Sequence, residues 1–482
     1  MIRDLRSALD VLARAGDPVQ VVDAPVDPRV GLIAGIFQTI SGPGRSWMTA
    51  EQPLQLYRQP LHGRFPLVTG LFGSRSRLRF LLDPERHHGT EPIPGARPTG
   101  PGNAALLLNA IAAPRPVTRG PAATPRTVIP GANPGVWLPA TTCTARDPGP
   151  TITMGLVHAR DDAGRANASV HRITLKRHSA TIGINPTGHL ARMIAAAAAQ
   201  GRRLPVSVNI GLDPAVYVAA ALSRPAMAYG DDELAVAGAL RNRALALAPC
   251  FTNDAWFIDH AEIVIEARLG PETEPEHEAD APPDARTMPE YLGYTSPAGP
   301  VTTLHVDALS HRPDALYQAV TGPGREQAEL LGAGQEAAML KMLRKAGIGD
   351  LVRDVIASPA GGGHLLTAIR LAKTTPADDR RVVEAACEAA SALPAAKLVV
   401  LVDDDVDPRA GDDLLWAIAT RFHPARDLHL TAELPGTPLD PSQSAAVRPG
   451  ARGDDPDGLT ARQILDCTVP FHLRDRFRRA FS

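Results

Sequence analysis

The segment FIDHAEIVIE, residues 257–266, carries the clearest strand signal in the sequence, because its second half is dominated by β-branched residues. Shorter β-branched runs bounded by turn residues lie on both sides of it, at 152–157, 173–175, 206–210 and 301–306. An alanine-rich stretch at 189–200 is expected to form a helix between two of these strands. The middle of the chain is therefore predicted to be rich in strands.

Both ends of the chain have helical patterns. Ile2, Leu5, Leu9 and Leu12 recur at helical spacing and predict an amphipathic helix that Gly16 ends. The last third alternates helical and strand patterns, at 326–346, 365–371, 378–393, 397–402 and 412–421. That order is typical of a βαβ layer with a parallel sheet.

Three stretches interrupt these patterns. Prolines are frequent at 83–150, which predicts irregular connections around short strands rather than long helices. Residues 271–290 hold seven Asp or Glu, five Pro and one Arg, a composition typical of a solvated loop. Residues 440–458 are expected to form a polar loop, and the tail ends in a basic segment at 474–479.

Composition excludes several classes of partner. The 482 residues include 50 Lys and Arg against 52 Asp and Glu, for a net charge of −2, so nucleic-acid binding is not expected. No wholly apolar run approaches the roughly 20 residues that span a bilayer, so no membrane segment is predicted. The four cysteines are far apart in the sequence, which indicates reduced thiols in the cytoplasm rather than a disulfide framework.

No short catalytic motif identifies the chemistry. The sequence has no Walker A motif, no G-x-S-x-G, no H-E-x-x-H and no glycine fingerprint for dinucleotides. The glycines at 361–363 are interpreted as a turn before a strand rather than as a phosphate loop. Composition and periodicity alone thus indicate only a soluble α/β protein.

Several separated blocks, however, carry a further signal: NASVHR at 167–172 is followed by GHL at 188–190, NIGLDP at 209–214 and DELAVAGAL at 232–240. In content and order these blocks resemble the UbiD family of decarboxylases, which use prenylated FMN. NASVHR, residues 167–172, resembles the family's N-x-G-x-Y-R motif, with Ser169 and His171 in place of its Gly and Tyr. Further blocks resemble the family's sequence at 188–190 (GHL), 209–214 (NIGLDP), 232–240 (DELAVAGAL), 261–266 (AEIVIE), 397–407 (KLVVLVDDDVD) and 420–427 (TRFHPARD).

The resemblance covers nearly the whole chain and implies an α/β (α+β) fold. It predicts an N-terminal α+β region at 1–120 and a split β-barrel domain that binds prenylated FMN at 121–320. A C-terminal α/β domain with a role in oligomerisation is expected at 325–482.

The resemblance also implies a set of cofactor-binding residues. Asn167, His189 and Glu233 are expected to hold Mn²⁺ or Mg²⁺ against the flavin phosphate, and Lys397 to add a positive charge. Amide, imidazole and carboxylate ligands suit such a cation better than a thiolate-seeking metal. Ser223 is expected to join Glu233 at a K⁺ site.

The implied reaction is the reversible, non-oxidative decarboxylation of an α,β-unsaturated or aromatic acid. Arg172 is expected to contact the cofactor and orient the substrate carboxylate, and Glu290 aligns with the family's proton donor. In the family this proton donor is the second acid of an E-x4-[ED] motif, and in this sequence Ala285 replaces the first acid of the motif. Asp284 is the first-ranked substitute. The other acids that can fold back are Glu272, Glu274, Glu276 and Glu278.

Two other functions stay open because of that replacement. The alternatives to an active decarboxylase are a flavin-binding relative with altered chemistry and a non-catalytic scaffold that keeps the fold. An active enzyme is expected to serve specialised or aromatic-acid metabolism, to receive its cofactor from a flavin prenyltransferase, and to form a homo-oligomer, with a dimer favoured. The sequence does not identify the carboxylic acid substrate.

Overall fold

We describe the protein from a computed structural model. It describes residues 1–29, 31–43, 46–83, 102–222, 224–282, 286–437, 440, 442 and 459–480. The chain divides into two compact units. Unit 1 comprises Met1–Gly95, Asn109–Ala221 and Met227–Leu330, and unit 2 comprises Ala96–Leu108, Leu222–Ala226 and Leu331–Ser482.

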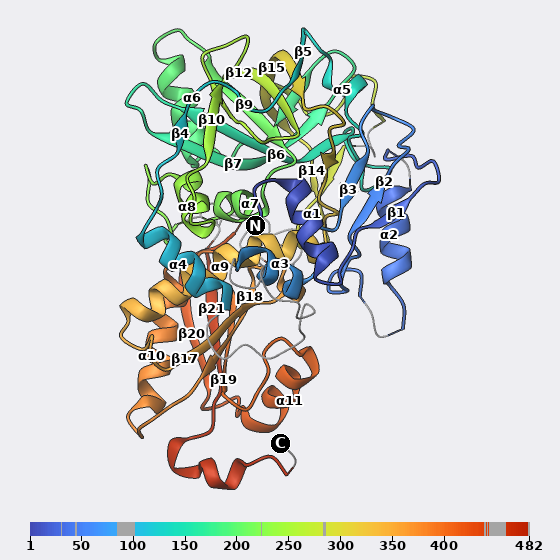
Figure 1. The fold of residues 1–482 in the computed structure, drawn as a ribbon. Helices are drawn as coiled ribbons and strands as arrows, with labels where there is room; N and C mark the ends of the chain where they lie inside the picture. Colours follow the sequence, from blue (N-terminus) through green and yellow to red (C-terminus); the bar gives the residue numbers. More distant parts are fainter. Residues whose placement is uncertain are drawn as a thin grey trace. The chain divides into compact units, whose positions relative to one another are not determined.

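Unit 1 is built around a closed antiparallel barrel of six strands, seen at the top of Figure 1. In spatial order the strands are β12 (Ile263–Pro275), β9 (Leu204–Ile210), β6 (Thr151–Arg160), β7 (Ala166–Leu175), β8 (Ala180–Ile182) and β15 (Pro300–His311). Pairing of β12 with β15 closes the ring, and β5 (Thr127–Pro130) adds to the other edge of β15. The expected α/β fold with a central barrel is confirmed.

Alternating side chains fill the barrel. Val206, Val208 and Ile210 of β9 belong to one buried apolar cluster with Ile263 and Ile265 of β12. Helix α6 (His189–Ala198) adds Leu190, Met193, Ile194 and Ala197 to the same cluster. Burying a side chain of this size contributes about 1.5–3 kcal/mol, so this cluster holds the barrel closed. The predicted helix and the strands predicted at 152–157, 173–175, 206–210 and 301–306 are therefore present. The single strand predicted at 257–266 is wrong: a turn, closed by the hydrogen bond from Ala261 N–H to the Ile258 carbonyl, divides it between β11 (Trp256–Ile258) and β12, which belong to different sheets.

The acidic stretch that we expected to be a solvated loop is partly a strand. β12 continues to Pro275, and Thr273 and Glu274 pair with β15. The strand is stabilised there because its acids meet cations of other segments: Glu272 pairs with Arg203, Glu274 with Lys176 and Glu276 with Arg172. Composition alone misses this effect, since it counts the acids without their partners.

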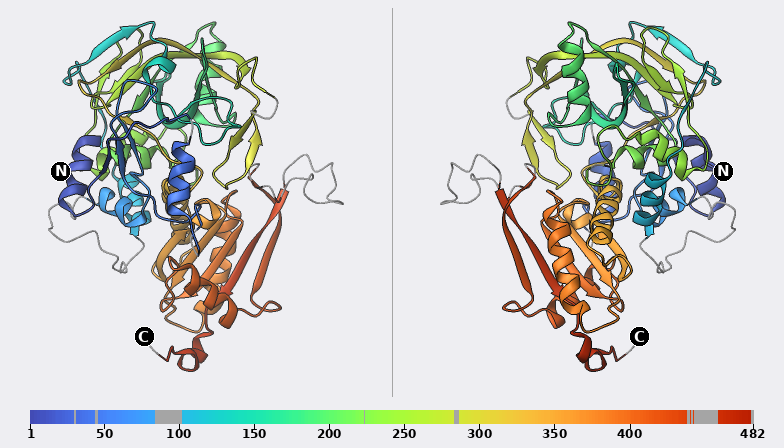
Figure 2. Two further views of the ribbon diagram at one scale, coloured as in Figure 1. Left: turned by 90° about the vertical axis from the view of Figure 1, so that its right-hand side faces the viewer. Right: turned by 90° about the vertical axis from the view of Figure 1, so that its left-hand side faces the viewer.

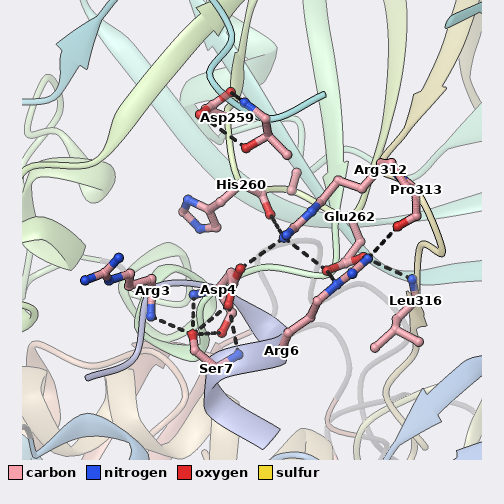
Figure 3. Close-up of polar contacts among 12 residues, drawn as sticks. Arg3, Asp4, Arg6, Ser7, Asp259, His260, Glu262, Arg312, Pro313 and Leu316 are labelled. Atoms are coloured by element: carbon pink, nitrogen blue, oxygen red, sulfur yellow. Dashed lines mark hydrogen bonds and ion pairs between the residues drawn. The ribbon is translucent and has the colours of Figure 1, made fainter. Parts of the chain in front are cut away.

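The N-terminal helix α1 (Leu5–Arg14) is anchored to the barrel by a buried carboxylate, shown in Figure 3. Arg6 donates from Nε and Nη2 to the two oxygens of Glu262, each at 2.8 Å. Arg312 donates to both Glu262 and Asp4, at 3.2 and 3.0 Å. Glu262 is fully buried, so its charge depends on these two guanidinium groups.

The rest of unit 1 consists of small sheets and helices. One sheet has the order β1 (Gln20–Val22), β2 (Gln55–Tyr57), β3 (Leu67–Thr69) and β16 (Tyr317–Gln318). A second has the order β11 (Trp256–Ile258), β10 (Ala246–Pro249) and β4 (Thr118–Arg119). The helices are α2 (Leu32–Ile40), α3 (Arg75–Leu82), α5 (Pro134–Trp137), α7 (Pro214–Ala220) and α8 (Glu233–Leu240). A further helix, α4 (Gly102–Ala112), lies in the region predicted to lack long helices; its residues up to Leu108 are part of unit 2, and the rest are part of unit 1.

Unit 2 contains a five-stranded sheet. Its order is β17 (Val352–Ala357), β18 (Leu366–Leu371), β19 (Leu398–Asp403), β21 (Leu459–Cys467) and β20 (Leu428–Pro435), with helices α10 (Asp378–Ser391) and α11 (Gly411–Arg421). The central pairs are parallel as predicted, but both edge pairs are antiparallel. Figure 2 shows β20 and β21 as long strands at one side of the sheet. The sequence prediction missed both.

Helix α9 (Arg325–Lys345) matches the helix predicted near 326–346. Within unit 2, Glu336 of α9 accepts a hydrogen bond at 3.0 Å from the backbone N–H of Ala357 in β17. The four cysteines are free, as expected. Among the described residues, no helix combines the length and apolar character needed to span a membrane.

Candidate functional site

Strand β7 carries two of the predicted site residues. Asn167 lies near its start and is buried, and Arg172 lies five positions further on. β7 pairs with β6 and β8 on its two sides, so the backbone beneath both side chains is held in the barrel wall.

Glu233 is brought to β7 by a direct hydrogen bond. The backbone N–H of Ala168, next to Asn167, donates to Glu233 Oε2 at 3.0 Å. Glu233 is the first residue of α8, whose N-terminus is capped by the side chain of Asp232. Burial, reinforced by the charges of Asp232 and Asp231, raises the pKa of Glu233 to about 7 despite the backbone hydrogen bonds that oppose it. A cation beside this carboxylate favours its charged form.

His189 is tied to the segment that precedes α8. It is the first residue of α6, and its ring meets the ring of Tyr229 edge-on, with centroids 4.7 Å apart. The guanidinium groups of Arg165 and Arg192 lie over the same tyrosine ring, at 5.1 and 5.3 Å. The contacts thus connect Asn167 to Glu233 through Ala168, and His189 to the loop before Glu233 through Tyr229.

This set suits a hard divalent cation. It offers an amide oxygen, an imidazole and a carboxylate, which are ligands that Mn²⁺ and Mg²⁺ accept. Glu233 is only 6% exposed, so a coordinated cation compensates a charge that water does not solvate. Among the described residues no three His, Cys, Asp or Glu side chains are grouped so that they could hold a metal ion, and the predicted set contains only two of that kind.

Arg172 is held by an acid that was not the first-ranked candidate. Its Nε and Nη2 donate to the two oxygens of Glu276 at 2.9 and 3.1 Å, and Thr174 Oγ1 donates to the same carboxylate at 3.0 Å. Glu276 is 1% exposed, whereas the Arg172 side chain is 39% exposed. Nη1 of Arg172 donates to none of the described residues, so this nitrogen is available to a ligand carboxylate.

Glu290 acts on the same guanidinium from a short hairpin. The hairpin pairs β13 (Thr287–Pro289) with β14 (Thr295–Pro297), and Glu290 begins the turn. Its Oε1 accepts a hydrogen bond at 2.5 Å from Ser296. Burial lowers the pKa of Arg172, but the hydrogen bonds and charge of Glu276, together with the charge of Glu290, raise it above its usual value. Two carboxylates and one guanidinium therefore form a single electrostatic group.

The remaining predicted residues lie elsewhere. Lys397 is in unit 2, where its Nζ forms an ion pair with Asp440 at 2.7 Å and a hydrogen bond with Ser442. Asp284 and Ser223 lie outside the described residues. The predictions for these three positions stay predictions.

Comparison with known proteins identifies the family. The model of the 3-octaprenyl-4-hydroxybenzoate carboxy-lyase Rift-related domain (UbiD) matches residues 135–326, and that of the C-terminal domain (UbiD_C) matches 328–467. The chain is also 31% identical to a gallate decarboxylase of Lactiplantibacillus plantarum, over 99% of this chain and 96% of that protein. The chain belongs to the UbiD family. It is accordingly a carboxy-lyase, as the resemblance predicted.

Solved structures of UbiD-class enzymes have the same fold as this chain. An apo 3,4-dihydroxybenzoic acid decarboxylase from Enterobacter cloacae superposes with a TM-score of 0.87 at 30% identity, covering 99% of this chain and 96% of that one. The UbiD-class enzyme HmfF from Pelotomaculum thermopropionicum, in complex with FMN, gives 0.82 at 27% identity, covering 99% and 97%. This UbiD-family protein thus shares its whole fold with both.

Sequence reasoning underestimated two features of this UbiD site. Glu276 was only one of four lower-ranked acids, although Glu at 272, 274, 276 and 278 alternates as in a strand, which was the signal available. Tyr229, which touches His189, has no sequence signal, because a lone tyrosine in a loop is usually an ordinary surface residue.

Proposed function

We propose that this protein uses prenylated FMN to decarboxylate a hydroxylated benzoic acid reversibly and without net oxidation. The observation that supports it best is the group formed by Arg172, Glu276 and Glu290, in which Nη1 of Arg172 donates to none of the described residues and the charge of Glu290 acts on the same guanidinium. The substrate class is supported by two similar proteins, a gallate decarboxylase and a 3,4-dihydroxybenzoic acid decarboxylase. The cofactor is supported by HmfF, solved with FMN and with prFMN.

Asn167, His189 and Glu233 would hold Mn²⁺ or Mg²⁺, and with it the flavin phosphate. Their ligand types and the raised pKa of Glu233 fit this role. Lys397, and Ser223 with K⁺, remain proposed contributors. When bound, the prenylated flavin supplies the electron sink for loss of CO₂.

Each member of the Arg172 group has a distinct task. Arg172 binds the substrate carboxylate through Nη1, while Glu276 fixes the guanidinium from the other side. As CO₂ leaves, the electron pair of the broken C–C bond stays with the ring carbon, and Glu290 gives that carbon a proton. Ser296 donates to Oε1 of Glu290, which leaves Oε2 to carry this proton. Water then reprotonates Glu290, and the reverse sequence gives carboxylation.

In this proposal Glu276 replaces the missing first motif acid. Its contact with Arg172 supports decarboxylation rather than altered chemistry. The predicted cytoplasmic location, homodimer and supply of cofactor by a flavin prenyltransferase stay predictions.

The test is activity after co-expression with a flavin prenyltransferase. Mass spectrometry identifies the bound flavin, and CO₂ release and product formation are measured with 3,4-dihydroxybenzoate and gallate. Glu290→Gln is expected to bind the flavin but form no product. Glu278→Gln is the matched control, because Glu278 accepts from the backbone N–H of Arg177 rather than from Arg172. Loaded wild-type protein without activity on either acid, or an active Glu290→Gln variant, would overturn the proposal.

A further inference from the structure

A chain of hydrogen bonds leads away from Asn167 through the two residues that depart from the UbiD motif. Asn167 Nδ2 donates to Ser169 Oγ at 2.9 Å, and Ser169 Oγ lies 2.8 Å from His171 Nε2. His171 Nδ1 lies 2.9 Å from the backbone oxygen of Gly183. A Gly and a Tyr at these two motif positions cannot form this chain, since neither offers the serine hydroxyl or the imidazole.

The donor and acceptor of every hydrogen bond in this series follow from the last acceptor, the backbone oxygen of Gly183. A backbone carbonyl only accepts, so His171 Nδ1 carries a proton and donates to Gly183. Burial lowers the pKa of His171, so the ring is neutral and Nε2 is an acceptor. Ser169 therefore donates to His171, and its oxygen receives the bond from Asn167.

This order fixes which end of the Asn167 amide faces Ser169. The amide nitrogen of Asn167 must face Ser169, so the amide oxygen Oδ1 faces away from Ser169. Oδ1 accepts no hydrogen bond from the described residues. A flipped amide would put oxygen against oxygen at Ser169, with no proton between them, because the serine proton is already committed to His171.

The strand geometry makes the chain rigid. Asn167, Ser169 and His171 are spaced two apart on β7, so they share one face. Gly183 directly follows β8, which pairs with β7, and its N–H donates to the Arg172 carbonyl at 3.1 Å. The terminal acceptor is thus tied to the same strand that carries the other three groups.

We propose that Ser169 and His171 are positioning residues that turn the Asn167 amide oxygen toward the divalent cation. This inference rests on the proposed function, because that function supplies the cation. It assigns to the two departures from the UbiD motif a role that the motif itself does not provide.

The experiment measures Mn²⁺ binding, using FMN as the phosphate-bearing probe. Free Mn²⁺ is followed by electron paramagnetic resonance, and the Kd of FMN is measured with Mn²⁺ and with EDTA. Ser169→Ala and His171→Phe are expected to weaken Mn²⁺ binding by roughly 10- to 100-fold, the usual effect of removing an outer partner of a metal ligand. FMN affinity in EDTA should not change.

Conservative variants separate positioning from general damage. Ser169→Thr keeps the hydroxyl, and His171→Gln keeps one donor and one acceptor, so both are expected to bind Mn²⁺ within about threefold of wild type. Ser207→Ala is the matched control: this buried barrel serine donates to Trp256 at 2.7 Å, away from the chain, and its loss should leave Mn²⁺ affinity unchanged. Thermal melts check that each variant folds.

The outcomes distinguish the two proposals. Wild-type protein that shows no Mn²⁺ dependence of FMN binding would overturn the metal site and with it the proposed function. Wild-type protein that binds Mn²⁺ no more tightly than folded Ser169→Ala or His171→Phe would overturn the inference alone. If Ser169→Ala does not fold, His171→Phe and its conservative variant His171→Gln decide the question. If His171→Phe does not fold, Ser169→Ala and Ser169→Thr decide it.

Discussion

Replacing Glu276 by Gln tests the most specific feature of the proposed active site. The change keeps the shape of the side chain but removes its charge, and one of the two guanidinium nitrogens then faces an amide NH₂ instead of an oxygen. Hydrogen bonds to charged groups contribute about 1.5–3 kcal/mol each. Because the Arg172 side chain is 39% exposed, water compensates part of that loss, and we expect about 1–2 kcal/mol.

We expect most of this effect in catalysis, since Arg172 loses its orientation. A loss of about 1–2 kcal/mol of transition-state binding corresponds to a roughly 5- to 30-fold lower kcat/KM. The assay is decarboxylation by enzyme loaded with prenylated FMN, together with the Kd of FMN, which should not change. Glu274→Gln is the matched control, because Glu274 lies two residues earlier, near the end of β12, and pairs with Lys176. Wild-type kcat/KM in Glu276→Gln, or an equal loss in Glu274→Gln, would refute the reasoning.

Three other changes have expected outcomes. Gly183→Ala places a Cβ 3.1 Å from Cζ of Arg172, so the guanidinium must shift by a few tenths of an ångström; we expect a several-fold lower kcat/KM with unchanged flavin binding, and wild-type kinetics would contradict this. Arg6→Met leaves the carboxylate of the buried Glu262 with Arg312 as its ion-pair partner among the described residues, and the free energy of unfolding should fall by about 2–4 kcal/mol in urea titrations. Burial raises the pKa of Asp378, but the N–H groups of two threonines, a hydroxyl and an arginine lower it to about 2. Its stabilising effect is complete above the unfolded pKa of about 4 and disappears as pH falls toward 2, so wild-type stability should fall more steeply over that range than that of Asp378→Asn.

Local patterns predicted the regular elements well. The helices α1 and α9 follow from apolar spacing and end signals, and the barrel strands β6, β7, β9 and β15 follow from β-branched runs between turn residues. Prediction from local sequence patterns was wrong where a strand is stabilised by residues far away in the sequence. β12 holds its acidic end because Arg203, Lys176 and Arg172 lie beside it.

Edge strands were missed for a related reason. β20 is largely exposed, and it forms because β21, more than twenty residues later in the sequence, supplies its hydrogen bonds. The mixed direction of the sheet in unit 2 follows from these edge pairs, which the alternation of helix and strand does not encode.

The sequence by itself determined the family, the fold class and the residue types available for chemistry, because ordered blocks and local periodicity are properties of the chain. Only the tertiary structure decided which of five acids meets Arg172 and which way the Asn167 amide faces. Both depend on how the strands are placed: Glu276, directly after the end of β12, meets Arg172 of β7, and Gly183 fixes the direction of the hydrogen bonds that end at its carbonyl. Contacts of this kind are set by which backbone segments lie side by side, and no local stretch of sequence specifies that.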